Sequence, residues 1–258
     1  LASCGAAAVL YGFYRQGWRG VSPSEAPPGL GRRVRKLAAP LALSDYLRAA
    51  LRTLEQLLIP WGLAQAGASQ QRAMAAYGPV MGMVFPALML PSAFLYALVD
   101  LLIPELAACR AQRRAARLQS VTRQCLRAGL LFGSFTAGLL FVLAGPLAQI
   151  LYRSAEAGRL LRLFAPVALV LYLDALVDGM LKGLSEQVAN VRYNTITSAL
   201  DVALLFVLLP RYGLGGYVFT FIAAHLVNFA LSLRRLLRVT GLRASAGAAV
   251  RTALLAAG

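Results

Sequence analysis

The sequence of 258 residues is 59% hydrophobic and only 14% charged, and its mean hydropathy is +0.65. A soluble domain carries about 25% charged residues, so this composition excludes an ordinary water-soluble globule. The formal net charge of +16, from 26 Lys and Arg against 10 Asp and Glu, is often a sign of nucleic-acid binding. Here, however, the basic residues lie between three uncharged stretches, each longer than the ~20 residues that cross a bilayer as a helix: 73–99, 128–152 and 212–233. An integral membrane protein without a nucleic-acid partner is therefore predicted.

In chain order, residues 1–14 are predicted to end a first membrane-spanning helix, and residues 15–39 to form a linker because of their Pro, Gly and Ser content. Six further spans follow, and an eighth begins near residue 244. The six are predicted at 38–66, 80–104, 128–148, 164–183, 194–210 and 214–233. These stretches are too long and too uniformly apolar for the strands of a membrane barrel, so the predicted fold class is an all-α polytopic transmembrane helix bundle. Because the chain begins without Met inside one apolar segment and ends in another, we expect a fragment of a longer protein.

The distribution of Lys and Arg predicts which loops face the cytoplasm, since these residues accumulate in cytoplasmic loops. Eighteen of them lie in the loops after the first, third, fifth and seventh spans, against five in the loops of the other side. Three basic segments are therefore predicted to be cytoplasmic in a multi-pass protein of the cell membrane: Arg15 to Lys36, Arg110 to Arg127 and Arg234 to Arg243.

The cysteines and glycines carry little information about chemistry. Cys4, Cys109 and Cys125 are odd in number and widely spaced, which predicts neither a disulfide framework nor a metal site. The sequence GLLFG at 129–133 has the spacing of small residues that allows close contact between membrane helices.

The second span carries an unusual number of polar side chains. Asp45, Arg48, Arg52 and Glu55 are separated by three, four and three residues, which puts them, together with Gln56, on one face of a helix. A charge at the bilayer centre costs about 2.5–3.5 kcal/mol, so this face must contact protein or water. The functional interpretation is a cationic cavity for an anionic substrate, because the planar guanidinium group of arginine binds phosphate oxygens through two N–H groups.

Two structural alternatives explain the same residues. Asp45 and Glu55 have the helical spacing to form ion pairs with Arg48 and Arg52, respectively. Arg48 also lies near enough to the start of the span to extend its side chain to the membrane interface. We favour the cavity, because ion pairs with only a structural role are costly to keep in a membrane.

Candidate residues for binding a cation or coupling to protons lie on the fifth and sixth spans. Asp174 and Asp178 are one turn apart on the fifth span, and Asp201 follows Thr197 by one turn on the sixth. Acids within a membrane bind a cation, relay protons or pair with arginines of another helix. The seventh span adds a histidine and an asparagine one turn apart, His225 and Asn228. A lone histidine in a span is more often a hydrogen-bonded packing residue than a ligand.

Several segments carry a family resemblance. The pattern YGxxxGMxxPxxxxP is found at Tyr77, Gly78, Gly82, Met83, Pro86 and Pro91. It lies within 43–107, and further segments with the same resemblance are LAGPLAQILYRSAEAGRLLRLFAP at 143–166, GMLKGLSEQ at 179–187 and LLPRYGLGGY at 208–217. Over about residues 38–240 the chain resembles the stage V sporulation protein B group of polysaccharide and lipid-linked oligosaccharide flippases. This group belongs to the superfamily of the lipid II flippase and the multidrug and toxin extrusion transporters.

The resemblance implies a fourteen-helix flippase fold in which two six-helix lobes face a central cavity. Residues 1–14 would end the first lobe, 15–39 would link the lobes on the cytoplasmic side, and 40–233 would form the second lobe. Residues 234–258 would form a cytoplasmic loop and the start of an additional helix. Some related lipid II flippases bind sodium through acids on the seventh and eleventh helices. The matching helices carry Asp45 or Glu55 and Asp201 here.

The function implied is that of a transporter rather than an enzyme. It would move a lipid-linked oligosaccharide or peptidoglycan precursor, with a polyprenyl diphosphate, across the cytoplasmic membrane by alternating access. No cofactor is expected beyond a coupling cation, either sodium or a proton, and the expected partners are this lipid, membrane lipid and cell-wall synthesis enzymes. Two alternatives stay open. A cation-coupled multidrug exporter of the same superfamily should have acidic and aromatic cavity walls, and the chain could instead be a non-transporting scaffold of a cell-wall synthesis complex.

Overall fold

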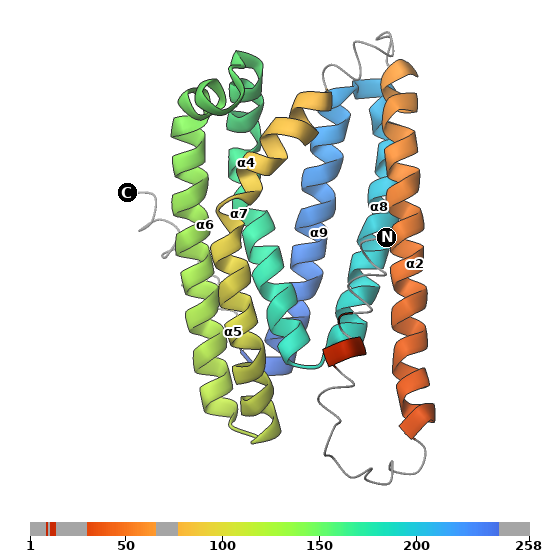
Figure 1. Cartoon of the computed structure of the whole chain (residues 1–258), viewed down its shortest axis with the longest axis vertical. Coiled ribbons are helices and arrows are strands. Elements are labelled where there is room, and N and C mark those ends of the chain that lie inside the picture. The colour runs from red at the N-terminus through yellow and green to blue at the C-terminus, as the bar shows by residue number, and fades with distance from the viewer. Residues whose placement is uncertain (1–8, 10, 14–29, 66–76, 243–258) are drawn as a thin grey trace. The chain divides into compact units, whose positions relative to one another are not determined.

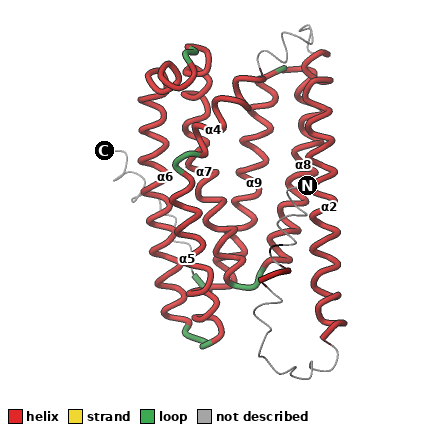
Figure 2. The backbone as a smooth tube through the Cα atoms, in the orientation of Figure 1, coloured by secondary structure: helices red, strands yellow, loops and turns green. Residues whose placement is uncertain are grey.

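The computed structural model describes residues 9, 11–13, 30–65 and 77–242, and the regular elements in this part of the chain are helices (Figure 2). The chain divides into two units, Leu1–Pro40 and Leu41–Gly258, and the helix packing and the cavities described below belong to the second. The helices follow one another in the order drawn in Figure 1: α2 (Leu30–Gln65), the π-helical turn η1 (Val80–Val84), α4 (Phe85–Met89), α5 (Ser92–Ala111), α6 (Ala115–Tyr152), α7 (Ala155–Gly183), α8 (Gln187–Tyr212) and α9 (Leu214–Thr240).

Five of these helices, α5 to α9, are long and apolar enough to cross a membrane. The prediction of an all-α, multi-pass membrane helix bundle is therefore confirmed for the described residues. Helix α2 is also long, with 36 residues, but carries the charged residues of the second predicted span. The first predicted span and the start of the eighth near residue 244 fall almost entirely outside the described residues.

The third predicted span, 80–104, differs from the structure because it is two helices rather than one. The helical segment that ends at Met89 is followed by a turn at Leu90 and Pro91, and α5 begins at Ser92. Proline has no N–H group to continue the hydrogen bonds of the preceding helix. The Ser92 hydroxyl donates instead to the Met89 carbonyl oxygen, at 2.6 Å, which satisfies one of the acceptors that the break leaves.

The linker expected at 15–39 overlaps the start of α2. Helix α2 begins at Leu30, directly after the sequence PPG, and continues through GRRVRKLAA. Arginine, lysine, leucine and alanine are good helix formers, which explains why the helix starts before the apolar stretch does. Residues 15–29 lie outside the described residues.

Helix α7 is the centre of the packing, since it contacts α6 on one side and α5 and α9 on others. Glycines bring α6 close to α7. A Cβ atom on Gly133 would lie 2.7 Å from the Leu169 side chain, and one on Gly129 would clash with Leu176. The close helix contact predicted from GLLFG is thus present, between α6 and α7. Larger residues at these two positions would separate the helices.

The turn between α7 and α8 is held by an acidic side chain. Glu186 accepts hydrogen bonds from Nη2 and Nε of Arg235 on α9, at 2.7 and 3.0 Å, and forms a longer ion pair of 3.4 Å with Arg110 on α5. Arg110 also donates to the Leu184 carbonyl oxygen. These contacts fix the ends of α5, α7, α8 and α9 relative to one another, and so hold the walls of the cavity described next.

Candidate functional site

A cavity of about 220 Å³ lies among α2, α7, α8 and α9. Most of the residues selected from the sequence contribute to it, although they come from four different helices. The side chains that line it are Arg48, Arg52, Glu55, Asp174, Asn194, Thr197, Ser198, Asp201, Phe221, Ala224, His225 and Asn228. We refer to the α2 residues as the α2 wall and to the others as the α7–α9 wall.

Helix α2 is attached to α8 near its C-terminal end. The rings of Trp61 and Phe206 stack with their centroids 5.4 Å apart, and Gly62 lets α2 approach the Leu209 side chain, which a Cβ atom would meet at 2.7 Å. Glu55 precedes this contact by less than two turns. The α2 wall is therefore positioned by apolar packing beyond its polar face.

The α2 wall consists of Arg48, Arg52 and Glu55. Arg48 is half-buried, and its Nε atom is buried without a hydrogen-bond partner among the described residues. Within the same part of the chain, neither arginine forms an ion pair of 4.0 Å or less with Asp45, Glu55 or any other acid. The pairing that the sequence allows along α2 is thus not formed at that distance, and the N–H groups of both arginines stay available to a ligand.

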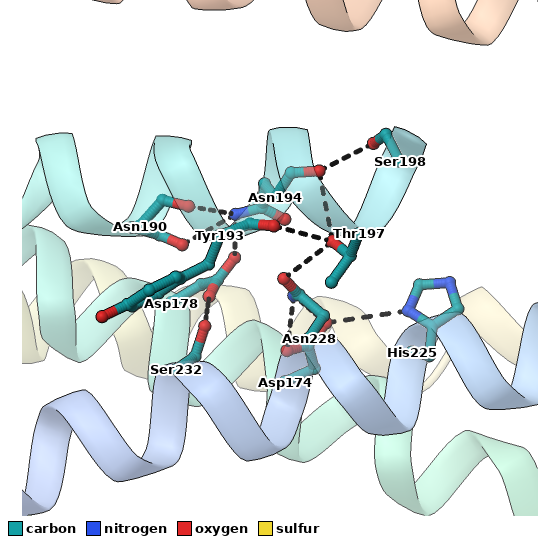
Figure 3. A network of polar contacts seen from close by, with 10 residues as sticks. All are labelled: Asp174, Asp178, Asn190, Tyr193, Asn194, Thr197, Ser198, His225, Asn228 and Ser232. Carbon is teal, nitrogen blue, oxygen red and sulfur yellow. Dashed lines mark hydrogen bonds and ion pairs between the residues drawn. The ribbon is translucent and has the colours of Figure 1, made fainter. Parts of the chain in front are cut away.

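The α7–α9 wall contains a connected hydrogen-bond network (Figure 3). Asn228 donates from Nδ2 to both carboxylate oxygens of Asp174, at 2.9 and 3.0 Å, and its Oδ1 accepts from the Thr197 hydroxyl at 3.2 Å. The three side chains are buried. Nδ1 of His225 lies 3.7 Å from Oδ2 of Asp174, so this carboxylate links α7 to two turns of α9.

Asp178 has a second set of partners, one turn further along α7. It accepts hydrogen bonds from Asn194 on α8 and Ser232 on α9, both at 3.3 Å, and Asn194 also donates to Asn190 at 2.7 Å. Figure 3 shows this set next to the one around Asp174. Asp178 does not line the cavity with the arginines. It lines a neighbouring cavity of about 450 Å³, which shares Asp174, Phe221 and His225 with the first.

Asp201 differs from both of these acids. It lines the cavity one turn after Thr197 and is half-buried. In the described part of the chain, no hydrogen bond or ion pair to its carboxylate is formed. Asp201 is therefore available to a cation or a proton, whereas Asp174 and Asp178 already accept hydrogen bonds.

Some sequence predictions of the site do not fit the geometry. Asp45 and Gln56 are exposed and do not line the cavity. The expected cationic character is only partly present, since two guanidinium groups share the cavity with three carboxylates, those of Glu55, Asp174 and Asp201. Both arginines lie on the α2 wall beside Glu55, and the other two carboxylates lie on the α7–α9 wall, so the cavity is not uniformly positive.

Sequence reasoning missed Asn194, Ser198, Phe221 and Ala224, which also line the cavity. The first two continue the polar face of α8 that carries Thr197 and Asp201, because residues three and four apart lie on one side of a helix. This spacing was the signal for them. Among the described residues, no group of three His, Cys, Asp or Glu side chains is arranged to hold a metal ion.

Comparison with known proteins gives one relative of low identity. No family model matches the sequence, and no solved structure matches it. Stage V sporulation protein B of Bacillus subtilis (strain 168) is 29% identical over 161 residues, which make up 62% of this chain and 31% of that protein. The chain thus spans less than a third of the relative's length. This similarity agrees with the family resemblance of the sequence. An identity of 29% over part of the chain supports the family and nothing finer, such as a substrate.

Proposed function

We propose that this chain is the second lobe of a membrane transporter that flips a lipid-linked oligosaccharide or peptidoglycan precursor across the cell membrane. The observation that carries the proposal is the α2 wall, where Arg48 and Arg52 line a cavity among membrane helices without a close acidic partner in the described residues. A guanidinium group offers paired N–H donors that match phosphate oxygens and stays charged at any working pH. A diphosphate is therefore the chemistry that suits this wall.

The polyprenyl tail of such a substrate would stay in lipid while the diphosphate sugar crosses through the cavity. Transporters with two lobes alternate access by rocking around a site near the middle of the membrane. In this proposal, residues 40–233 form the second lobe, 15–39 link the lobes in the cytoplasm, and the first lobe, which 1–14 end, completes the cavity. Residues 234–258 then lead from the end of α9 through a cytoplasmic loop into the start of an additional helix.

The acids of α7 and α8 are proposed to couple transport to a cation, either sodium or a proton. Asp201 is the principal candidate, because its carboxylate has no hydrogen-bond or ion-pair partner among the described residues, and Thr197 lies one turn away. Asp174 and Asp178 would support it through their hydrogen bonds to α8 and α9. Occupation of Asp201 by a cation would lower the negative charge opposite the arginines, which favours entry of an anionic headgroup.

A second function, cation-coupled export of drugs, is favoured by one observation. Three carboxylates and the aromatic ring of Phe221 line the same cavity, and a cationic organic substrate binds acidic and aromatic groups. The two functions predict opposite effects of removing the arginines of α2. Removing the arginines abolishes binding of an anionic headgroup, whereas it leaves or strengthens binding of a cation. A non-transporting scaffold of a wall-synthesis complex predicts no transport of either substrate.

The test is transport by the full-length protein in vesicles, with a fluorescent lipid-linked oligosaccharide in one assay and a cationic dye in another. The proposal predicts flipping of the oligosaccharide and loss of that activity in the Arg48→Ala/Arg52→Ala variant. The matched control is Arg123→Ala, which removes an exposed arginine of α6 outside the cavity. Dye transport without oligosaccharide flipping would overturn the proposal in favour of the exporter, and activity of neither kind in a well-folded protein would favour the scaffold.

The orientation in the membrane is tested separately. We propose that the basic segments from Arg15 to Lys36, from Arg110 to Arg127 and from Arg234 to Arg243 face the cytoplasm. Since Cys109 and Cys125 are buried, they are poor labelling sites, and all three native cysteines are first replaced by alanine. An impermeant thiol reagent should then label an Arg211→Cys variant in intact cells, and an Arg114→Cys variant only after the membrane is opened. The reverse pattern would contradict this orientation.

A further inference from the structure

A second cavity, of about 590 Å³, lies between the C-terminal part of α6 and the N-terminal part of α7. It shares no residue with the cavity of the α2 wall. We call it the α6–α7 groove. The residues that matter for its chemistry are Phe141, Gly145, Gln149, Arg159, Arg162 and Leu163. Most of the lining is apolar, and the two arginines are one turn apart on α7.

The depth of the groove in a bilayer follows from counting residues along the two helices. A spanning helix needs about 20 residues. On α7, about 20 residues toward the N-terminus from Lys182 lead to Arg162, and on α6 about 20 residues beyond Arg127 lead to Leu147. By this count Gly145 borders the hydrocarbon, Phe141 lies within it, and the arginines lie at the level of lipid phosphates.

The two arginines have no acidic partner in the described part of the chain. The guanidinium carbon of Arg162 lies 5.8 Å from the centroid of the Phe141 ring. A cation–π contact of this kind uses no hydrogen-bond donor, so the N–H groups of Arg162 can still donate to an anion. Arg159 and Arg162 are exposed, and among the described residues neither forms an ion pair, not even with Glu156 one turn away.

Two glycines shape the groove. A Cβ atom on Gly158 of α7 would lie 3.2 Å from the Gly145 Cα atom of α6, so the helices touch at this point. A Cβ atom on Gly145 would have no atom within 4 Å, so the surface of α6 is open on that side. A slender apolar chain can lie in this opening, next to Phe141 and Leu163.

From this arrangement we propose that the α6–α7 groove binds one anionic diacyl phospholipid. Arg159 and Arg162 hold its phosphate, and one acyl chain lies over Gly145 and against Phe141. The charge of the two arginines selects an anionic headgroup, since a positively charged choline beside the phosphate would be repelled. The binding does not depend on which substrate the transporter moves, because the groove is separate from the cavity of the α2 wall.

The experiment measures binding of dioleoyl phosphatidylglycerol and dioleoyl phosphatidylcholine to the purified full-length protein by native mass spectrometry. Wild-type protein should retain phosphatidylglycerol in preference to phosphatidylcholine. Replacing both arginines with glutamine should weaken binding of phosphatidylglycerol at least about tenfold, because charge-assisted bidentate hydrogen bonds are lost. Gly145→Leu should weaken it several-fold while leaving both arginines in place, because the leucine side chain occupies the opening.

Each variant has a matched control. Gly138 lies two turns before Gly145 on the same face of α6, also has open space where a Cβ atom would be, and does not line the groove, so Gly138→Leu should bind as wild type. The control for the arginine pair is Arg153→Gln/Arg211→Gln, which removes two exposed arginines from outside the groove. It should bind phosphatidylglycerol as wild type does.

Three results would overturn the proposal. Equal retention of the two phospholipids, or equal effects of the variants and their controls, would mean that lipid contacts the whole surface without a specific site. In a competition experiment, polyprenyl phosphate is added at the same concentration as phosphatidylglycerol. If it displaces phosphatidylglycerol from wild type but not from Gly145→Leu, the groove belongs to the transported substrate instead. Circular dichroism and gel filtration check that each variant is folded, and the arginine pair still tests the proposal if Gly145→Leu is not.

Discussion

The two walls of the cavity among α2, α7, α8 and α9 use similar polar side chains in different ways. On the α7–α9 wall, Asp174 accepts two hydrogen bonds from Asn228, which in turn accepts one from Thr197. On the α2 wall, Arg48 and Arg52 have no ion pair within 4.0 Å in the described part of the chain, and Nε of Arg48 is buried there without a partner. Polar groups satisfied inside the protein stabilise the fold. Polar groups without a partner are available to a ligand. We therefore expect the network around Asp174 to serve stability and the two arginines to serve function.

The largest effect is expected on the α2 wall. Arg48→Ala or Arg52→Ala should lower flipping of a lipid-linked oligosaccharide by about 100-fold, because each removes charge-assisted hydrogen bonds to a diphosphate. Lysine at either position should restore only part of the activity, since a point charge does not reproduce the paired donors of arginine. The thermal unfolding midpoint should hardly change. Measurement of flipping and unfolding on the same preparations tests this, and a large loss of stability with either alanine variant would remove the difference between the walls.

The opposite pattern is expected on the α7–α9 wall. Asn228→Leu removes the donor of both hydrogen bonds to the buried Asp174 carboxylate and should destabilise the protein by about 2–4 kcal/mol. Val227→Leu is the control, because it adds a leucine at the neighbouring, more exposed position of α9. Chemical denaturation in detergent compares the two variants. Equal stability would mean that the network around Asp174 contributes little to the fold.

A smaller and more selective effect is expected at Asp201. Because this carboxylate has no hydrogen-bond partner among the described residues, Asp201→Asn should leave unfolding unchanged. It should raise the cation concentration needed for half-maximal flipping by about tenfold, as expected for loss of a direct charge contact. Asp100→Asn, at an exposed position of α5 outside the cavity, is the control. Unaltered dependence on both sodium and pH in vesicles would exclude Asp201 from coupling.

The sequence predicts the fold class, and it places the three residues of the α2 wall on one helix face, for a physical reason. A long uncharged stretch in a membrane must be helical, because only a helix satisfies its own backbone hydrogen bonds there. The shared face of Arg48, Arg52 and Glu55 depends only on the local period of a helix. The glycines of GLLFG indicate close contact in the same way. The break at Leu90 and Pro91 was missed because the apolar stretch continues across it, although Pro91 itself was the signal.

The partners of the acids were not predictable from spacing. Asp174 and Asn228 are 54 residues apart in the chain, and their contact depends on how α7 and α9 pack. Spacing alone likewise groups the polar residues of α2 into one face, yet Gln56 and Asp45 are exposed and do not line the cavity that Arg48 and Arg52 line. Helical periodicity gives the face of a residue, but only packing decides which part of that face is covered. The same limit explains why Asp174 lines the cavity with the arginines and Asp178 does not.

The most direct test of the account concerns Arg52 and Glu55, which share the α2 wall. If Arg52 serves only to neutralise Glu55, then replacing the pair with uncharged residues of similar size, Arg52→Met with Glu55→Gln, should preserve both folding and transport. If Arg52 binds the headgroup, the double variant should fold normally and lose flipping. The measurement is flipping of a lipid-linked oligosaccharide by the double variant at matched protein level and unchanged thermal stability. We predict loss of transport by about 100-fold, as for the single alanine variants, and full activity would contradict the proposal that Arg52 binds the substrate.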